Sequence, residues 1–167
     1  MNDHALQRLL DEAACTKILK RYGHAVDWLD SAGLEKLFWL DAEIDLGFFK
    51  GSGMEAPGFL ITNARLSLRR CHITTNILIK VSGDTAQSES SAITHAISTN
   101  PQQGLDMHLF YGRYLDVFEC RDGEWRMAAR RYLLHSYSVQ PYAEDPALSA
   151  VRKAEGFGLD HPQFCQF

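Results

Sequence analysis

The fold is decided by the stretch Met107-His-Leu-Phe-Tyr-Gly-Arg-Tyr-Leu-Asp-Val-Phe-Glu-Cys120 and by the run from Trp125 to Val139 that follows it. Aromatic and β-branched residues are frequent in both runs, and such residues favour extended backbone. The pair Asp122-Gly123 between the runs is typical of a tight hairpin turn. The sequence therefore predicts two long antiparallel strands joined by that turn.

Strand patterns continue toward the N-terminus. The run from His72 to Val81 is rich in β-branched residues and stops at the turn sequence Ser82-Gly-Asp84. A further run from Thr85 to Thr99 ends at Asn100-Pro101, and a shorter strand is predicted over residues 42–49. Four long consecutive strands form a meander, so we expect a curved, largely antiparallel sheet.

Helical periodicity precedes the meander. Over residues 3–30 apolar side chains recur every three or four positions without a proline, which predicts one long helix with Asp3 available as its cap. A short second helix is predicted from Ser31, and a third over residues 57–70, beginning at Pro57. Together these patterns predict an α+β domain, a cone-like curved antiparallel or mixed sheet with the N-terminal helices packed on its concave face.

The length and composition fit a single domain with a sizeable core. The chain has 167 residues, and 46% of them are hydrophobic. We expect this domain to span residues 1–140. The remaining segment, residues 141–167, contains three prolines and two glycines. It is predicted to be an irregular or short-helical tail that packs on the same domain.

Charge and cysteine usage argue against several classes of partner. The 17 basic and 21 acidic residues give a net charge of -4, and no basic run exceeds two residues, so nucleic acid and anionic membranes are not expected as partners. The start, Met-Asn-Asp-His, lacks signal-peptide features, and no apolar stretch has the length of a bilayer span. The four cysteines form no C-x-x-C pair and the histidines lack metal-ligand spacing, which predicts reduced thiols, a cytoplasmic location and no metal.

Asp27 and His72 are the first candidate pair. Asp27 comes late in the predicted first helix, and His72 opens the first long strand of the meander. If the two side chains meet inside a pocket, the carboxylate would fix the tautomer of the imidazole and raise its basicity. A histidine so placed is suited to removing a proton from a substrate.

Further polar residues alternate with apolar ones along the predicted strands. Polar side chains are costly to bury unless they are paired or functional, so they mark candidate substrate-binding positions. By strand alternation Asn76 shares a face with His72, His95 lies on the next strand, and Arg130 shares a face with Tyr132. The register favours Arg130 over Arg131 as the arginine that faces inward, although one bulge would exchange them.

Several motifs together resemble a known family. They are Tyr22-x4-Asp27, Leu37-Phe38-x2-Asp41-Ala42, His72-x3-Asn76, and Gly112-Arg-Tyr-x-Asp-x-Phe118 leading to Asp122-Gly-x-Trp125. In these motifs the chain is similar to the SnoaL-like branch of the nuclear-transport-factor-two superfamily, which includes scytalone dehydratase, hexachlorocyclohexane dehydrochlorinase and bile acid dehydratase. The resemblance covers roughly residues 5–140 and implies the cone-like fold described above.

The resemblance also implies roles for residues. It implies that His72 abstracts a proton, that Asp27 orients it, and that Tyr22 polarises a carbonyl or assists a leaving hydroxyl. Arg130 and His95 fall near positions that line the pocket in relatives. The implied function is a cofactor-independent lyase of the dehydratase type, or an isomerase, acting on a small apolar cyclic or aromatic substrate. Because several strands read apolar on both faces, a homodimer or homotrimer is expected.

A second resemblance leaves another function open. The run from Phe110 to Leu134 is similar to the small β subunits of ring-hydroxylating dioxygenases. That resemblance implies a non-catalytic subunit or a small-molecule-binding module with the same fold. The pattern of Tyr22 and Asp27 favours the lyase or isomerase.

Overall fold

The computed structural model describes residues 3–151, 153, 157–162 and 164. Its elements in chain order are α1 (Asp3–Asp27), α2 (Ser31–Glu35), β1 (Phe38–Asp45), β2 (Lys50–Ser52), α3 (Ala56–Ala64), β3 (Arg69–Ser82), β4 (Thr85–Thr99), β5 (Leu105–Arg121), β6 (Glu124–Tyr142) and a 3-10 turn, η1 (Pro146–Leu148).

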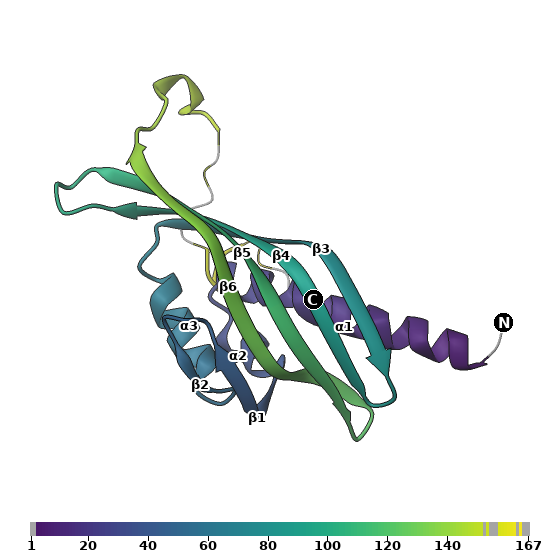
Figure 1. Ribbon diagram of the computed structural model, residues 1–167. Helices are drawn as coiled ribbons and strands as arrows, with labels where there is room; N and C mark the ends of the chain where they lie inside the picture. Colours follow the sequence, from purple (N-terminus) through teal and green to yellow (C-terminus); the bar gives the residue numbers. More distant parts are fainter. Residues whose placement is uncertain (1–2, 152, 154–156, 163, 165–167) are drawn as a thin grey trace.

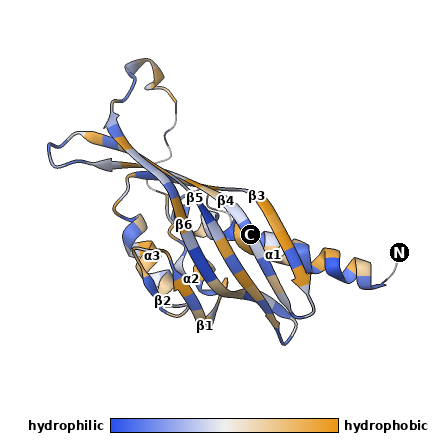
Figure 2. Ribbon diagram, in the orientation of Figure 1, coloured by the Kyte–Doolittle hydropathy of each residue, from blue (hydrophilic) through white to orange (hydrophobic). Residues whose placement is uncertain are grey.

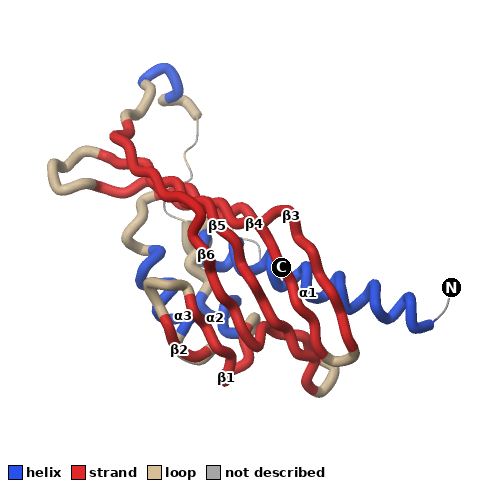
Figure 3. Tube along the Cα trace, viewed as in Figure 1, coloured by secondary structure: helices blue, strands red, loops and turns tan. Residues whose placement is uncertain are grey.

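The strands form one mixed sheet in the order β2-β1-β6-β5-β4-β3. The long strands β3 to β6 pair antiparallel as a meander, whereas β1 joins β6 in parallel. The helices lie against one face of this twisted, open sheet (Figure 1), and Figure 3 shows the long strands running past the helical layer. The predicted α+β class, with helices on the concave face of a curved mixed sheet, is confirmed.

Several predicted boundaries differ from those of the structure. The third helix was expected over residues 57–70, but α3 ends at Ala64 and a short link brings the chain to β3 at Arg69. The strand expected over residues 42–49 is β1, which lies earlier, at Phe38–Asp45. β6 passes through Pro141 to Tyr142 at its outer end, where little pairing is lost because a proline is tolerated at strand edges.

The core lies between the C-terminal half of α1 and the concave face of the sheet. Leu19, Tyr22 and Val26 of α1 are buried there, and Phe118 and Met127 face them from β5 and β6. The N-terminal half of α1 extends beyond the edge of the sheet (Figure 1), where Leu6, Leu9 and Leu10 are exposed. Burial thus fixes the end of α1 that carries Asp27 and leaves the other end free of the core.

Part of the C-terminal segment contacts the end of α1. The ring of Phe157 stacks on Trp28 with a centroid distance of 4.0 Å and an interplanar angle of 4°, and Phe164 lies near the same ring. The division into a domain over residues 1–140 and a tail over 141–167 stays a prediction. No helix among the described residues has the length and apolarity needed to cross a membrane.

Candidate functional site

Asp27 and His72 are in direct contact. The Oδ1 atom of Asp27 lies 2.6 Å from Nδ1 of His72, and the backbone N–H of His72 donates to Oδ2 over 3.0 Å. Only 15% of the Asp27 side chain and 18% of the His72 side chain are exposed. Because the carboxylate accepts a hydrogen bond from Nδ1–H, the lone pair of the ring remains on Nε2.

Local sequence explains why the helix can come so close to the strand. A Cβ atom on Gly23 would lie 3.2 Å from the Cβ of His72, so glycine at this position allows α1 to pack tightly on β3. Arg70, on the same strand, donates to the carbonyl oxygens of Val26, Ala64 and Ser67. The ends of α1 and α3 are therefore tied to β3 beside the pair.

His72 lines a cavity of about 580 Å³ between α1, α3 and the concave face of the sheet. Tyr22, Tyr114 and Tyr132 line the same cavity. Asp27 is not among the lining residues, so it lies behind the imidazole rather than in the cavity. Leu46, Leu60 and Phe110 are among the apolar residues of the wall, which suits an apolar ligand.

The three tyrosines are neutral hydrogen-bond donors rather than bases. Burial raises the pKa of Tyr22, and the opposing attraction of the Arg130 guanidinium is smaller. Burial likewise raises the pKa of Tyr114 well above its usual range and also raises the pKa of Tyr132. His72 is therefore the group in this wall best suited to accept a proton.

Arg130 faces inward, as the register favoured, but it supports the cavity from beneath. Its guanidinium lies 4.1 Å from the centre of the Tyr22 ring and 4.0 Å from that of Tyr114. Asp116 accepts hydrogen bonds from its Nε and Nη2 atoms at 2.7 and 2.9 Å. Burial acts to lower the pKa of Arg130, but the Asp116 carboxylate outweighs that effect and raises it. A direct contact between Arg130 and substrate, expected from the sequence, does not fit this arrangement.

Two further predicted binding residues, His95 and Asn76, also lie outside the cavity. His95 pairs with Cys71, whereas His72 pairs with Thr94, so His95 points to the opposite face of the sheet. Asn76 lies where the pairing of β3 shifts register, with φ at +49°, and its amide donates to Ser91. The shift turns Asn76 away from the face that it was expected to share with His72.

Gly112 gives Tyr132 its position. A Cβ atom on Gly112 would lie 2.4 Å from the hydroxyl of Tyr132, because the phenol lies directly over this glycine. The glycine in the middle of β5 therefore allows a close approach by a side chain from β6.

We expect Gly112→Ala to displace the Tyr132 ring and to lower the free energy of unfolding by about 1–3 kcal/mol, as overpacking does in well-packed sites. Urea denaturation measures the change. Gly58→Ala is the matched control, since its Cβ would meet no atom within 4 Å and alanine favours the helix α3. Equal stability of the Gly112 variant and the native chain would contradict the account.

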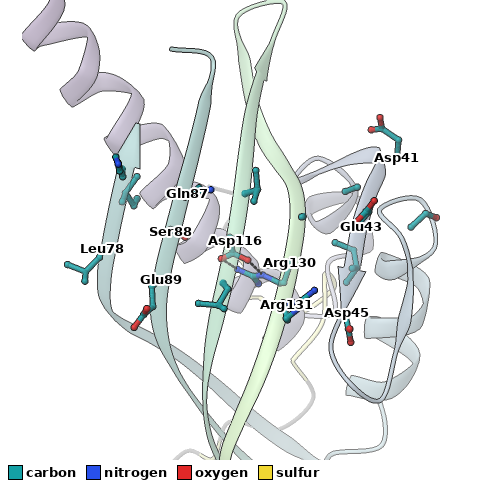
Figure 4. A pocket seen from close by; sticks show the side chains of 18 of the residues that line it. Asp41, Glu43, Asp45, Leu78, Gln87, Ser88, Glu89, Asp116, Arg130 and Arg131 are labelled. Carbon is teal, nitrogen blue, oxygen red and sulfur yellow. Dashed lines mark hydrogen bonds and ion pairs between the residues drawn. The ribbon is translucent and has the colours of Figure 1, made fainter. Parts of the chain in front are cut away.

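A second hollow, of about 860 Å³, extends over β1 and the long strands (Figure 4). The close-up shows the ion pair of Arg130 and Asp116 at its centre, with Glu43 and Asp45 toward β1 and Glu89 on the other side. Its lining mixes carboxylates with basic side chains and apolar residues. Figure 2 shows a hydrophobic run on β3, at the sheet edge.

Sequence reasoning missed the partners that hold the site. Asp116 lies within the motif from Gly112 to Phe118, and a carboxylate opposite Arg130 in an alternating strand is a signal for a buried ion pair. Tyr114 and Arg70 were also missed. Among the described residues no three His, Cys, Asp or Glu side chains are grouped as metal ligands.

A family model described as the SnoaL-like domain matches residues 7–131. The chain belongs to the SnoaL-like family. No curated protein matches it by sequence. Among solved structures this SnoaL-like chain is similar to a type 2 hexachlorocyclohexane dehydrochlorinase, LinA, with 22% identity, a TM-score of 0.72, and coverage of 84% of this chain and 95% of the other.

Two further structures have the same fold. A protein from Novosphingobium aromaticivorans, described as a candidate scytalone dehydratase, is 21% identical, with a TM-score of 0.67 and coverage of 83% of this chain and 91% of the other. A protein of unknown function with a cystatin-like fold, from Nostoc punctiforme, is 17% identical, with a TM-score of 0.60 and coverage of 85% and 96%. At these identities the likeness shows the fold alone.

Proposed function

We propose that the chain is a cofactor-independent lyase of the dehydratase type, or an isomerase, that removes a proton from carbon. The observation that carries the proposal is the contact between Asp27 and Nδ1 of His72 at the wall of a largely apolar cavity. With Nδ1–H held by the carboxylate, Nε2 of His72 takes the proton, and Asp27 stabilises the imidazolium that forms. The reactions for which the similar dehydrochlorinase and candidate dehydratase are named support this reaction class.

Negative charge that develops on a substrate oxygen needs a hydrogen-bond donor to stabilise it. Tyr22 and Tyr132 line the cavity with hydroxyl groups that remain protonated, so either can donate a hydrogen bond to an oxygen that gains charge. The buried guanidinium of Arg130 lies under the Tyr22 ring and adds a fixed positive charge nearby.

The substrate is a small, largely apolar cyclic or aromatic molecule, and the protein acts in the cytoplasm as a homodimer or homotrimer.

A carbon acid of known chemistry tests this function without the natural substrate. In 5-nitrobenzisoxazole a base takes the proton from carbon, the N–O bond breaks, and a coloured cyanophenolate is released. We expect the native chain to catalyse this elimination with saturation kinetics and faster than free imidazole at the same concentration. A chain that serves only as a subunit or as a binding module would bind the probe without turnover, and that outcome would remove the proposal.

A further inference from the structure

Three hydrogen-bonded side chains at one end of the cavity are not used by the proton abstraction. The Oγ atom of Ser98 lies 2.8 Å from Nε2 of His108, and Nδ1 of His108 lies 2.7 Å from the hydroxyl oxygen of Tyr137. Ser98 and His108 line the cavity from β4 and β5, whereas Tyr137 on β6 is 46% exposed. The chain of contacts thus connects the cavity wall with the rim.

These three side chains lie away from the proposed base, His72. His72 pairs with Thr94, and Ser98 is four residues farther along the same face of β4, about 13 Å at the usual rise of a strand. On β4 the residue between them on this face is Ala96, which offers no polar side-chain group and pairs with His108, and Phe110 lies opposite Thr94. A single small functional group cannot reach both ends, but a ligand of about two fused rings can lie between them.

The hydrogen-bonded side chains are suited to binding an uncharged oxygen of a ligand. Each nitrogen of His108 has a hydroxyl partner, and a hydroxyl can either donate or accept, so Ser98 can bind a carbonyl or a hydroxyl group of a ligand. Arg70 is the one Lys or Arg side chain among the described residues that line the cavity, and it already donates to three backbone carbonyls. A carboxylate or phosphate would therefore find no available arginine or lysine here.

We propose that Ser98, supported by His108 and Tyr137, is a second polar subsite that binds a hydroxyl or carbonyl oxygen of the substrate remote from the carbon that His72 deprotonates. The substrate class that follows is an uncharged, largely apolar molecule of about two fused rings with an oxygen at the far end. The statement that this oxygen lies remote from the reacting carbon rests on the proposed function of His72. Ser98 touches the ligand, and His108 and Tyr137 are positioning residues that act through it.

Binding of two ligands of similar shape tests the subsite. We expect the full chain to bind 2-naphthol more tightly than 2-methylnaphthalene, which lacks the hydroxyl. Ser98→Ala should weaken naphthol binding by about three- to tenfold, the effect of one neutral hydrogen bond, and leave binding of the methyl analogue unchanged. Ser98→Thr retains the hydroxyl and should retain the preference. Ser91→Ala removes a hydroxyl from the opposite face of β4 and serves as the matched control.

Tyr137→Phe separates positioning from general stability. It removes the hydrogen bond to His108 without shortening the ring, so we expect a partial loss of the preference for naphthol and no change for the methyl analogue. The subsite is overturned if the native chain shows no preference for naphthol, or if Ser98→Ala weakens both ligands equally. Because these measurements are of binding, failure of the benzisoxazole elimination would remove the proposed reaction without removing the subsite.

Discussion

Replacing His72 by alanine is expected to slow the elimination of 5-nitrobenzisoxazole by about a hundred- to ten-thousand-fold, the usual contribution of a positioned base. Among the described residues the tyrosines that line the cavity near His72 are held protonated by burial, so they cannot replace it as the proton acceptor. The measurement is the initial rate of phenolate release at saturating probe. Unchanged binding of 2-methylnaphthalene would show that the cavity itself is intact.

Asp27→Asn should have an effect of the same order for a different reason. An asparagine amide can donate to Nδ1, which favours the tautomer with the proton on Nε2 and thereby blocks the base. His95→Ala is the matched control for both variants, since His95 lies on the neighbouring strand but on the opposite face of the sheet. Near-native rates in the His72 or Asp27 variant, or a comparable loss in the His95 variant, would remove the mechanism.

The second large effect concerns stability. Arg130→Met should lower the free energy of unfolding by about 3–5 kcal/mol, because it leaves the Asp116 carboxylate buried without its partner. The side chains of Arg130 and Asp116 are 1% and 0% exposed, so water cannot replace the lost hydrogen bonds. Urea denaturation monitored by tryptophan fluorescence measures the change.

The double variant Arg130→Met with Asp116→Leu provides the control. Replacing both partners by apolar side chains removes the unpaired charge, so we expect the double variant to recover much of the stability that the single variant loses. The Nη1 atom of Arg130 has no hydrogen-bond partner among the described residues, which adds to the cost of keeping the charge buried. If the single and double variants are equally unstable, the loss comes from packing against the two tyrosine rings rather than from the ion pair.

The fold could be predicted because its strands are long and their turns are explicit. Asp122-Gly123 and the run from Trp125 fixed the main hairpin, and the helical spacing before residue 30 placed Asp27 at a helix end. Contact between Asp27 and His72 joins residues 45 positions apart, and the family motif, rather than periodicity, indicated it. The parallel pairing of β1 with β6 has no local signal, because it depends on a connection through the rest of the sheet.

The errors in the site have a common physical cause. The orientation of a strand residue is counted from a reference position, and a shift of one residue reverses it. Asn76 lies within such a shift in β3. His95 was predicted to bind substrate, but the face of β4 that lines the cavity carries Thr94 and Ser98, and His95 points to the other face.

The carboxylate of Asp27 binds the ring and the backbone of the same histidine, so one side chain both fastens α1 to β3 and orients the proposed base. A mutation that moved the helix would therefore also disturb the proposed base, and this wall of the cavity has little freedom to vary. In the wall formed by β4 and β5, no described side chain both joins a helix to the sheet and orients the proposed base. Descendants of this scaffold could exchange side chains there, and so acquire new substrates, while keeping the proposed proton abstraction.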